Sequence, residues 1–168
     1  MTDPRTTDPR EAQTSEAQIR EVEVYNAVAS VDDPEYPGIS ITDLGLVEEV
    51  TVDATGDVSI GLVPTFSGCP ALALIAEDVQ TAVSAVHGVG EVTVTWLRNP
   101  VWTVDRVSDA GKAALANDFT VAVTIGDHSP PCPRCGGATT RTSLFGPSRC
   151  RSVHRCLECN ENLEVMRA

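Results

Sequence analysis

Apolar residues at helical spacing mark two segments in the first half of the chain. In the clearer segment, residues 69–86, six apolar side chains recur at helical spacing and Gly88 follows, so the pattern predicts a helix that stops at the glycine. These side chains are Leu72, Ile75, Ala76, Val79, Val83 and Val86. A weaker pattern predicts a helix over residues 15–30, with Ser15 as its N-terminal cap.

Alternation of apolar and polar residues predicts the strands. They cover residues 46–52, 58–63, 91–97 and 119–125. The turn residues 53–57, which include Gly56, predict a hairpin between the first two strands. The order helix, strand, strand, helix, strand is typical of a small α/β (α+β) domain in which helices cover a mixed sheet.

Composition divides the chain into three parts. Residues 1–18 are rich in Thr, Asp, Pro, Arg and Glu, and we expect them to form a disordered lead-in. Residues 19–126 hold the predicted α/β domain, and residues 127–168 follow a proline-rich boundary as a separate module. Inside the α/β domain, two prolines in residues 32–38 predict an irregular loop, and a short helix is expected over residues 110–116.

The last module carries two Cys-x-x-Cys pairs. The four cysteines are Cys132, Cys135, Cys156 and Cys159. Twenty residues separate the pairs, which is the spacing of a four-thiolate zinc site. Gly136 and Asn160 follow the pairs, and both residue types adopt positive φ readily, so each turn can curl its N–H groups toward the sulfurs. Two disulfides or four inert thiols are the alternative, which a reducing compartment disfavours.

Charge is unevenly distributed along the chain. The net charge is -12, and residues 132–168 contribute six arginines against three acidic residues, which leaves a strongly acidic body before them. Such a body repels phosphate backbones, so we expect no nucleic-acid partner. The first residues lack the apolar run of a signal peptide, and the longest apolar stretch, residues 71–76, is too short to span a bilayer. We therefore expect no membrane partner and a reducing, cytoplasmic location.

A lone cysteine lies in the loop of residues 64–71, between a predicted strand and the best-defined helix. The pattern puts Cys69 in the first turn of that helix, with Pro70 at an N1-like position. A helix N-terminus stabilises a thiolate and lowers its pKa, so Cys69 is a candidate nucleophile or metal ligand. The alternative is a buried small apolar residue, and position alone does not separate the two.

Other candidate residues are less specific. Asp33, Glu35 and Asp43 lie in upstream loops, where they can hold a metal or cap backbone groups, and spacing alone favours capping. The three histidines have no companions at ligand spacing, which favours surface or supporting roles. The chain contains no dinucleotide fingerprint, phosphate-binding loop or nucleophile elbow, and no acid–base pair stands out. The sequence therefore argues against an autonomous enzyme.

Several motifs together resemble a known family. Asp33-Pro34-Glu35, the segment Ser-Ile-Thr-Asp-Leu-Gly-Leu-Val at 40–47 and the segment Pro-Thr-Phe-Ser-Gly-Cys-Pro-Ala at 64–71 resemble the SufT-like iron–sulfur assembly domain. The segments 99–103 and 143–150, together with the cysteine pairs, narrow the resemblance. The whole is similar to the PaaD family, small accessory proteins encoded with the multicomponent phenylacetyl-CoA epoxidase of phenylacetate catabolism.

The resemblance implies an α/β SufT-like domain followed by a zinc ribbon, and a role in metallocentre maturation for an oxygenase. It implies that Cys69 handles iron or an iron–sulfur cluster transiently, near Asp33, Glu35 and Asp43. The two cysteine pairs would hold structural zinc, and Cys150 would be an additional metal contact beside them. Implied partners are oxygenase or reductase subunits and other iron–sulfur assembly proteins, and self-association stays open.

Two other functions fit the same features. A non-catalytic structural or coupling subunit would dock on the oxygenase without transferring metal, and a rubredoxin-like electron carrier would use iron in the four-thiolate site. The chain also departs from the resemblance after Cys159, where it lacks the usual Pro-Phe pair and the cysteine of the usual ending. The substrate of the client oxygenase therefore stays open.

Cys150 lies outside both Cys-x-x-Cys turns, and four thiolates already complete a tetrahedron, so Cys150 is not expected to be an obligatory zinc ligand. The variant Cys150→Ser should keep the zinc content of the parent when the purified protein is measured by metal analysis. Loss of half or more of the zinc would show that these four cysteines are the wrong set.

Overall fold

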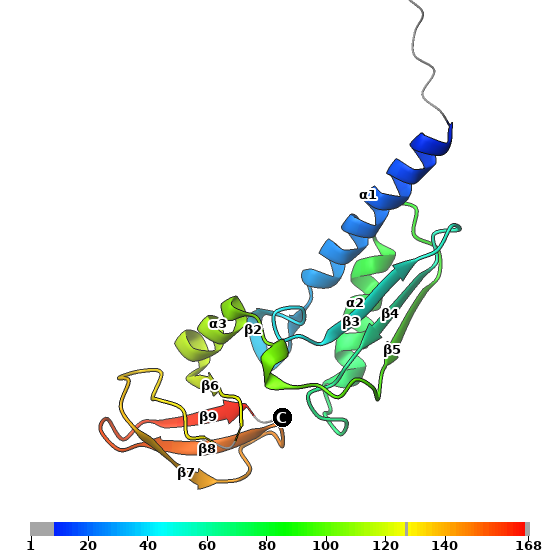
Figure 1. Ribbon diagram of the computed structural model, residues 1–168. Helices are drawn as coiled ribbons and strands as arrows, with labels where there is room; N and C mark the ends of the chain where they lie inside the picture. The colour runs from blue at the N-terminus through cyan, green and yellow to red at the C-terminus, as the bar shows by residue number, and fades with distance from the viewer. Residues whose placement is uncertain (1–8, 127, 167–168) are drawn as a thin grey trace, which may run out of the picture.

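The computed structural model describes residues 9–126 and 128–166, and Figure 1 shows their arrangement. In chain order the elements are α1 (Pro9–Ala29), β1 (Asp32–Asp33), β2 (Tyr36–Ser40), β3 (Val47–Val52), β4 (Val58–Leu62), α2 (Leu72–Ser84), β5 (Val92–Trp96), the 3-10 turn Val104–Arg106, α3 (Asp109–Phe119), β6 (Val121–Val123), β7 (Thr139–Ser143), β8 (Arg151–Cys156) and β9 (Asn162–Met166). The fold is the predicted mixture of helices and mixed sheets.

A three-stranded sheet forms the centre of the first domain. β3 and β4 are an antiparallel hairpin, and β5 lies parallel to β4 because α2 carries the chain back across the sheet. α1 and α2 lie side by side over this sheet (Figure 1). Ile75, Val79 and Val83 of α2 are buried, which confirms the apolar face predicted from their spacing.

The first helix begins earlier than the sequence pattern predicts. Composition favours a disordered lead-in that includes residues 9–18, but α1 begins at Pro9. Residues 1–8 of that lead-in lie outside the described residues. α1 has 21 residues and is long enough to cross a bilayer, but its sequence is largely polar. Within residues 9–126 and 128–166, no helix combines the length and the apolar character of a membrane span.

The segment 32–38 is not wholly irregular, although its two prolines indicate a loop. β1 and β2 pair as a short antiparallel hairpin, although β2 contains Pro37 and Gly38. A two-stranded sheet tolerates proline because each strand has an edge that donates no ladder hydrogen bonds. The Gly38 N–H instead donates to a carboxylate oxygen of Asp32 at 2.7 Å.

The C-terminal sheet has the strand order β6-β9-β8-β7. β7, β8 and β9 form an antiparallel ribbon, and β6 adds to it in parallel with β9. The sequence pattern places residues 121–123 in the first domain, which it extends to residue 126. Their strand instead pairs with the last strand of the chain, a contact that local sequence patterns do not reveal.

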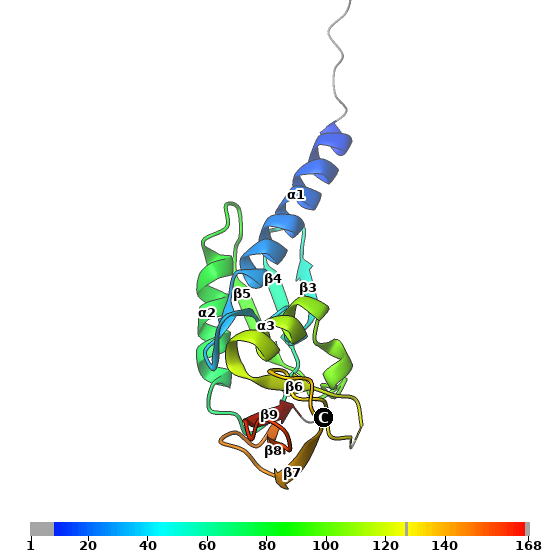
Figure 2. The same cartoon turned by 90° about the vertical axis from the view of Figure 1, so that its left-hand side faces the viewer.

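The first domain and the four-stranded C-terminal sheet contribute to one hydrophobic core. Val121 of β6 and Met166 of β9 belong to the same buried cluster as Val79 of α2. The rings of Tyr36 and Phe119 pack edge to face in this region, with centroids 5.2 Å apart. The ribbon is therefore not a freely tethered module, and Figure 2 shows it directly below α3.

The loop between β2 and β3 is held by the segment that precedes α3. The Trp102 indole N–H donates to the Leu44 carbonyl at 2.9 Å, and Arg106 Nε donates to the Gly45 carbonyl at 2.8 Å. Gly45 has a φ of 69°, and a Cβ there would collide with the backbone carbonyl of Arg106. Glycine at this position allows the two segments to approach closely.

Replacing Gly45 with Ala is therefore expected to destabilise the protein by more than replacing Gly38 with Ala. Gly38 also has a positive φ, 89°, but a Cβ there would meet no atom within 4 Å. Gly38→Ala should cost about 1–2 kcal/mol from backbone strain alone. Gly45→Ala should cost about 1–3 kcal/mol more, because it adds overpacking. Urea unfolding of the two variants measures both losses, and equal losses would contradict the close contact.

Candidate metal centre and the Cys69 loop

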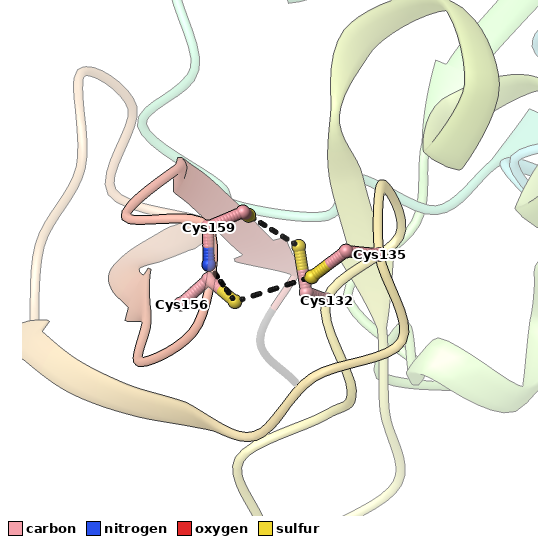
Figure 3. Close-up of side chains that lie close together, drawn as sticks. All are labelled: Cys132, Cys135, Cys156 and Cys159. Atoms are coloured by element: carbon pink, nitrogen blue, oxygen red, sulfur yellow. Dashed lines mark hydrogen bonds between the residues drawn. The ribbon is translucent and has the colours of Figure 1, made fainter.

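The two Cys-x-x-Cys pairs converge at one end of the ribbon, as Figure 3 shows. Cys132 Sγ lies 3.7 Å from Cys159 Sγ, and Cys135 Sγ lies 3.5 Å from Cys156 Sγ. All four sulfurs lie within 4.8 Å of one another. Each close contact joins one cysteine of the first pair to one of the second, so the tertiary structure brings the sequence-predicted ligands together.

These separations are those of a tetrahedral metal site. Four sulfurs that each lie about 2.3 Å from a central ion are about 3.8 Å from one another. Cys132 and Cys156 are buried, whereas Cys135 and Cys159 are exposed, so the centre lies at the surface of the ribbon. Four thiolates in this geometry fit zinc, and they also fit iron.

The backbone of each pair turns back toward the sulfurs. Gly136 and Asn160 adopt φ values of 76° and 61°, which confirms that both pairs end in a residue with positive φ. In the first turn the Gly137 N–H points at Cys135 Sγ, with a nitrogen–sulfur distance of 3.4 Å. Such N–H groups stabilise the thiolate form, which is the form that binds metal.

In the second turn, an N–H group lowers the pKa of one of the metal-site thiols. The Cys159 N–H donates to Cys156 Sγ at 3.5 Å. This contact is the main cause that lowers the pKa of Cys156 to about 7, and the Glu158 N–H and neighbouring sulfurs lower it further. The backbone N–H groups of this turn therefore favour the thiolate form of Cys156, which is the form that binds metal.

Cys69 lies in the loop between β4 and α2, but it is not in the first helical turn. Its N–H donates to the Phe66 carbonyl at 3.1 Å, and its carbonyl accepts from the Leu72 N–H at 3.4 Å. Ala71 is the N-cap of α2, so Pro70 precedes the cap and the N1-like position predicted for it is wrong. Cys69 is a half-buried free thiol.

The side-chain carboxylate of Glu35 contacts the ribbon. One carboxylate oxygen of Glu35 accepts from Ser148 Oγ at 2.7 Å and from Arg151 Nη2 at 3.0 Å. Asp33 accepts from the Glu35 N–H at 2.8 Å, and burial is the main cause that raises the pKa of Asp33. The loop that holds both acidic residues therefore lies where the two domains meet.

Arg151 is a key residue that sequence reasoning did not identify. Its side chain is 9% exposed, and it forms ion pairs with Glu35 at 3.0 Å and with Glu164 of β9 at 2.7 Å. Its guanidinium also lies 5.2 Å from the centre of the Tyr36 ring. An arginine in a polar strand is usually exposed, and its partners are distant in sequence, so no local signal marked it.

Asp43 has a structural partner. Its carboxylate accepts from Ser108 Oγ at 2.6 Å, and Ser108 in turn caps α3 by accepting from the Gly111 N–H at 2.9 Å. The contacts described for Asp43 are thus with α3, and they do not bring it to the Cys69 loop. The carboxylate of Asp43 therefore has a structural contact, but it supports the capping residue Ser108 and caps no backbone group of the described residues itself.

His154 has a buried, supporting position rather than a surface position, the other of the two roles that the sequence leaves open. The residue is 3% exposed, and its Nε2 lies 3.2 Å from the hydroxyl of Ser152, which is likewise buried. His154 belongs to β8, two residues before the metal-site residue Cys156. It therefore supports the strand that carries part of the candidate metal centre.

Fold and site together define an α/β domain that carries a four-cysteine metal-binding ribbon. The model of the family described as iron-sulfur cluster assembly protein matches residues 21–95, and the PaaD zinc beta ribbon domain matches residues 117–167. The chain belongs to the PaaD family. The ribbon match starts before β6, in line with the pairing of β6 and β9.

The similar proteins match either most of the chain or about half of it. The chain is 33% identical over 153 residues to an Escherichia coli protein provisionally named as the D subunit of 1,2-phenylacetyl-CoA epoxidase, and the similarity covers 86% of this chain and 91% of the relative. It is 36% identical over 92 residues to the Fe-S protein maturation auxiliary factor YitW of Bacillus subtilis, and this similarity covers 55% of this chain and 89% of the relative.

A solved structure supports the fold of the first domain. A domain of unknown function from Bacillus anthracis is 34% identical, with a TM-score of 0.57, and the similarity covers 62% of this chain and 98% of that chain.

Replacing Cys135 with Ser is expected to release the ribbon metal, because three thiolates cannot complete the tetrahedron. Residues 132–166 should then become sensitive to limited proteolysis, which mass spectrometry of the fragments detects. Ser143→Ala is a matched control, because this residue also lies in the ribbon but outside the sulfur cluster. A Cys135→Ser protein with full metal content and parental resistance would contradict the assignment.

Proposed function

We propose that this protein is a maturation factor that handles iron or an iron–sulfur unit for a multicomponent oxygenase of the phenylacetyl-CoA epoxidase type. The observation that carries this proposal is the match to iron–sulfur cluster assembly proteins over residues 21–95, which include Asp33, Glu35 and Cys69. The similarity over most of the chain to a protein named for the epoxidase supports the choice of client. The chain itself acts as a non-catalytic accessory protein.

Cys69 is the residue proposed to handle the cargo. It is a free thiol in a loop, outside the hydrophobic core of the described residues, so its sulfur is not needed for packing. The same loop lines one side of an open groove of ≈ 700 Å³, together with Trp96 and Trp102. A client or donor protein can therefore approach this loop closely. We place this exchange in the cytoplasm, where thiols stay reduced.

Zinc is the metal proposed for the four-cysteine centre. Zinc is redox-inert and is held by four thiolates in structural sites that leave no position open. Among the described residues, a separate apolar cluster in the ribbon comprises just Ala122, Leu163 and Val165. Metal binding would then supply much of the folding energy of this part, on the order of 10 kcal/mol in small zinc modules.

A structural or coupling subunit is the second candidate function. The ribbon exposes large apolar side chains at its surface, with Leu144 at 53%, Phe145 at 58% and Leu157 at 64% exposed. Exposed apolar residues on one module favour protein contacts. In this alternative the ribbon docks on the oxygenase and Cys69 has no role in metal delivery.

Replacing Cys69 with Ser separates the two candidates. The stability of the variant should stay within about 1 kcal/mol of the parent, because the residue is a half-buried loop residue outside the core. The oxygenase produced together with the variant should be under-metallated and poorly active. Metal analysis and activity of the purified oxygenase measure this effect, and Ser84→Ala, at an exposed residue of α2 outside the groove, is the control.

A fully metallated and active oxygenase with Cys69→Ser would overturn the maturation proposal and favour the coupling subunit. A collapsed variant would show that the thiol is a packing residue. Cys69→Ala, which keeps a small uncharged side chain, then tests whether loss of packing or loss of sulfur is responsible.

A further inference from the structure

Cys69 and Cys150 are the two cysteines outside the four-sulfur centre. Both are half-buried free thiols, and neither belongs to the apolar clusters of the described residues. Cys69 comes from the loop after β4 in the first domain, and Cys150 immediately precedes β8 in the ribbon. Packing therefore does not account for either sulfur.

The ribbon residues around Cys150 are fixed on the first domain. Ser148 Oγ and Arg151 Nη2 donate to the same oxygen of Glu35, at 2.7 and 3.0 Å. Arg151 Nη2 also donates to Ser148 Oγ at 2.6 Å, which closes the loop on itself. Cys150 lies between these two anchors in sequence, so the contacts hold it at the junction of the domains.

The Cys69 loop reaches the same junction from the other side. In Figures 1 and 2 the loop between β4 and α2 extends below the N-terminal end of α2 toward the ribbon sheet. Burial is the main cause that raises the pKa of Cys150; the Arg151 guanidinium lowers it, and charge on Glu35 and on the Cys69 sulfur raises it. The Cys69 sulfur thus contributes to the electrostatic surroundings of Cys150, in line with the approach of the two loops.

Two thiols on opposite sides of a domain junction have a different chemistry from the ribbon centre. Four protein thiolates close a coordination sphere, whereas two leave positions open for ligands from a second protein. Soft sulfur donors select thiophilic cations over magnesium or calcium. Each thiol would lose its proton on binding, so occupancy releases two protons for each cation.

We propose that Cys69 and Cys150 together form a second metal site, a two-thiol site at the domain junction that takes a thiophilic divalent cation such as ferrous iron as cargo. This inference rests on the proposed maturation function and names the second residue that it requires. Glu35 is engaged by Arg151 and Ser148, so it positions the Cys150 loop and is not a ligand. The ribbon keeps its own metal while cargo occupies the junction.

Cobalt(II) alone, added without oxygen to the full-length zinc-loaded protein, tests the site. The parent should bind one additional cobalt ion with thiolate-to-cobalt charge-transfer absorption and without losing zinc. Cys69→Ser and Cys150→Ser should each weaken this binding by about tenfold or more, since even indirect partners of metal ligands contribute that much. Ser67→Ala and Arg149→Ala, on exposed neighbours in the same two loops, should bind as the parent does.

Parental cobalt affinity in Cys150→Ser would overturn the two-thiol site, as would cobalt uptake that only displaces zinc. A second measurement uses the parent protein and therefore needs no variant. Phenylarsine oxide bonds two nearby thiols through arsenic and releases water. In the parent it should link the peptides of Cys69 and Cys150. The site would also be overturned if phenylarsine oxide fails to link the two peptides although a reagent that alkylates single thiols still modifies both cysteines.

The outcomes separate this inference from the proposed function. If Cys150→Ser binds cobalt normally while Cys69→Ser impairs the client, the maturation proposal stands and the assignment of Cys150 as the second ligand is wrong. If both variants lose cobalt while the client is still fully metallated, the site exists but does not serve the proposed client, and the maturation proposal fails.

Discussion

A single buried guanidinium, that of Arg151, connects the two halves of the molecule. It pairs with Glu35 of the first domain at 3.0 Å and with Glu164 of the ribbon at 2.7 Å, and it lies over the ring of Tyr36. Arginine suits this position because its planar group donates to several acceptors at once and remains charged. A buried charge stripped of its partners would cost about 3–5 kcal/mol, so the two carboxylates and the arginine depend on one another.

The arrangement of the domains follows from this contact and from the shared core. β6 directly follows α3 in sequence but pairs with β9, so the last strand of the chain lies beside the segment that leaves the first domain. Val121 and Met166 extend the apolar cluster of the α/β domain into the ribbon sheet. The ribbon is therefore held on both a polar and an apolar surface, and its loops keep a defined position relative to the Cys69 loop.

The six cysteines fall into two groups with different surroundings. The four that share one centre are close neighbours in sequence within each pair, and their sulfurs lie at the separations of a closed tetrahedral site. Cys69 and Cys150 are single residues on separate loops. A closed site favours a resident structural metal, whereas a site with open positions favours exchange, which is what the proposed pairing of Cys69 and Cys150 would require.

The sequence by itself determined the features that depend on short spacing. Helical periodicity predicted α2, and the three-residue spacing within each cysteine pair predicted the sulfur centre, because both depend on local backbone geometry. Only the tertiary structure decided the partners of Arg151, the pairing of β6 with the ribbon strand β9 and the contact of Asp43 with Ser108, the residue that caps α3. Each of these joins residues far apart along the chain, and such contacts are fixed by the packing of the whole core rather than by any local pattern.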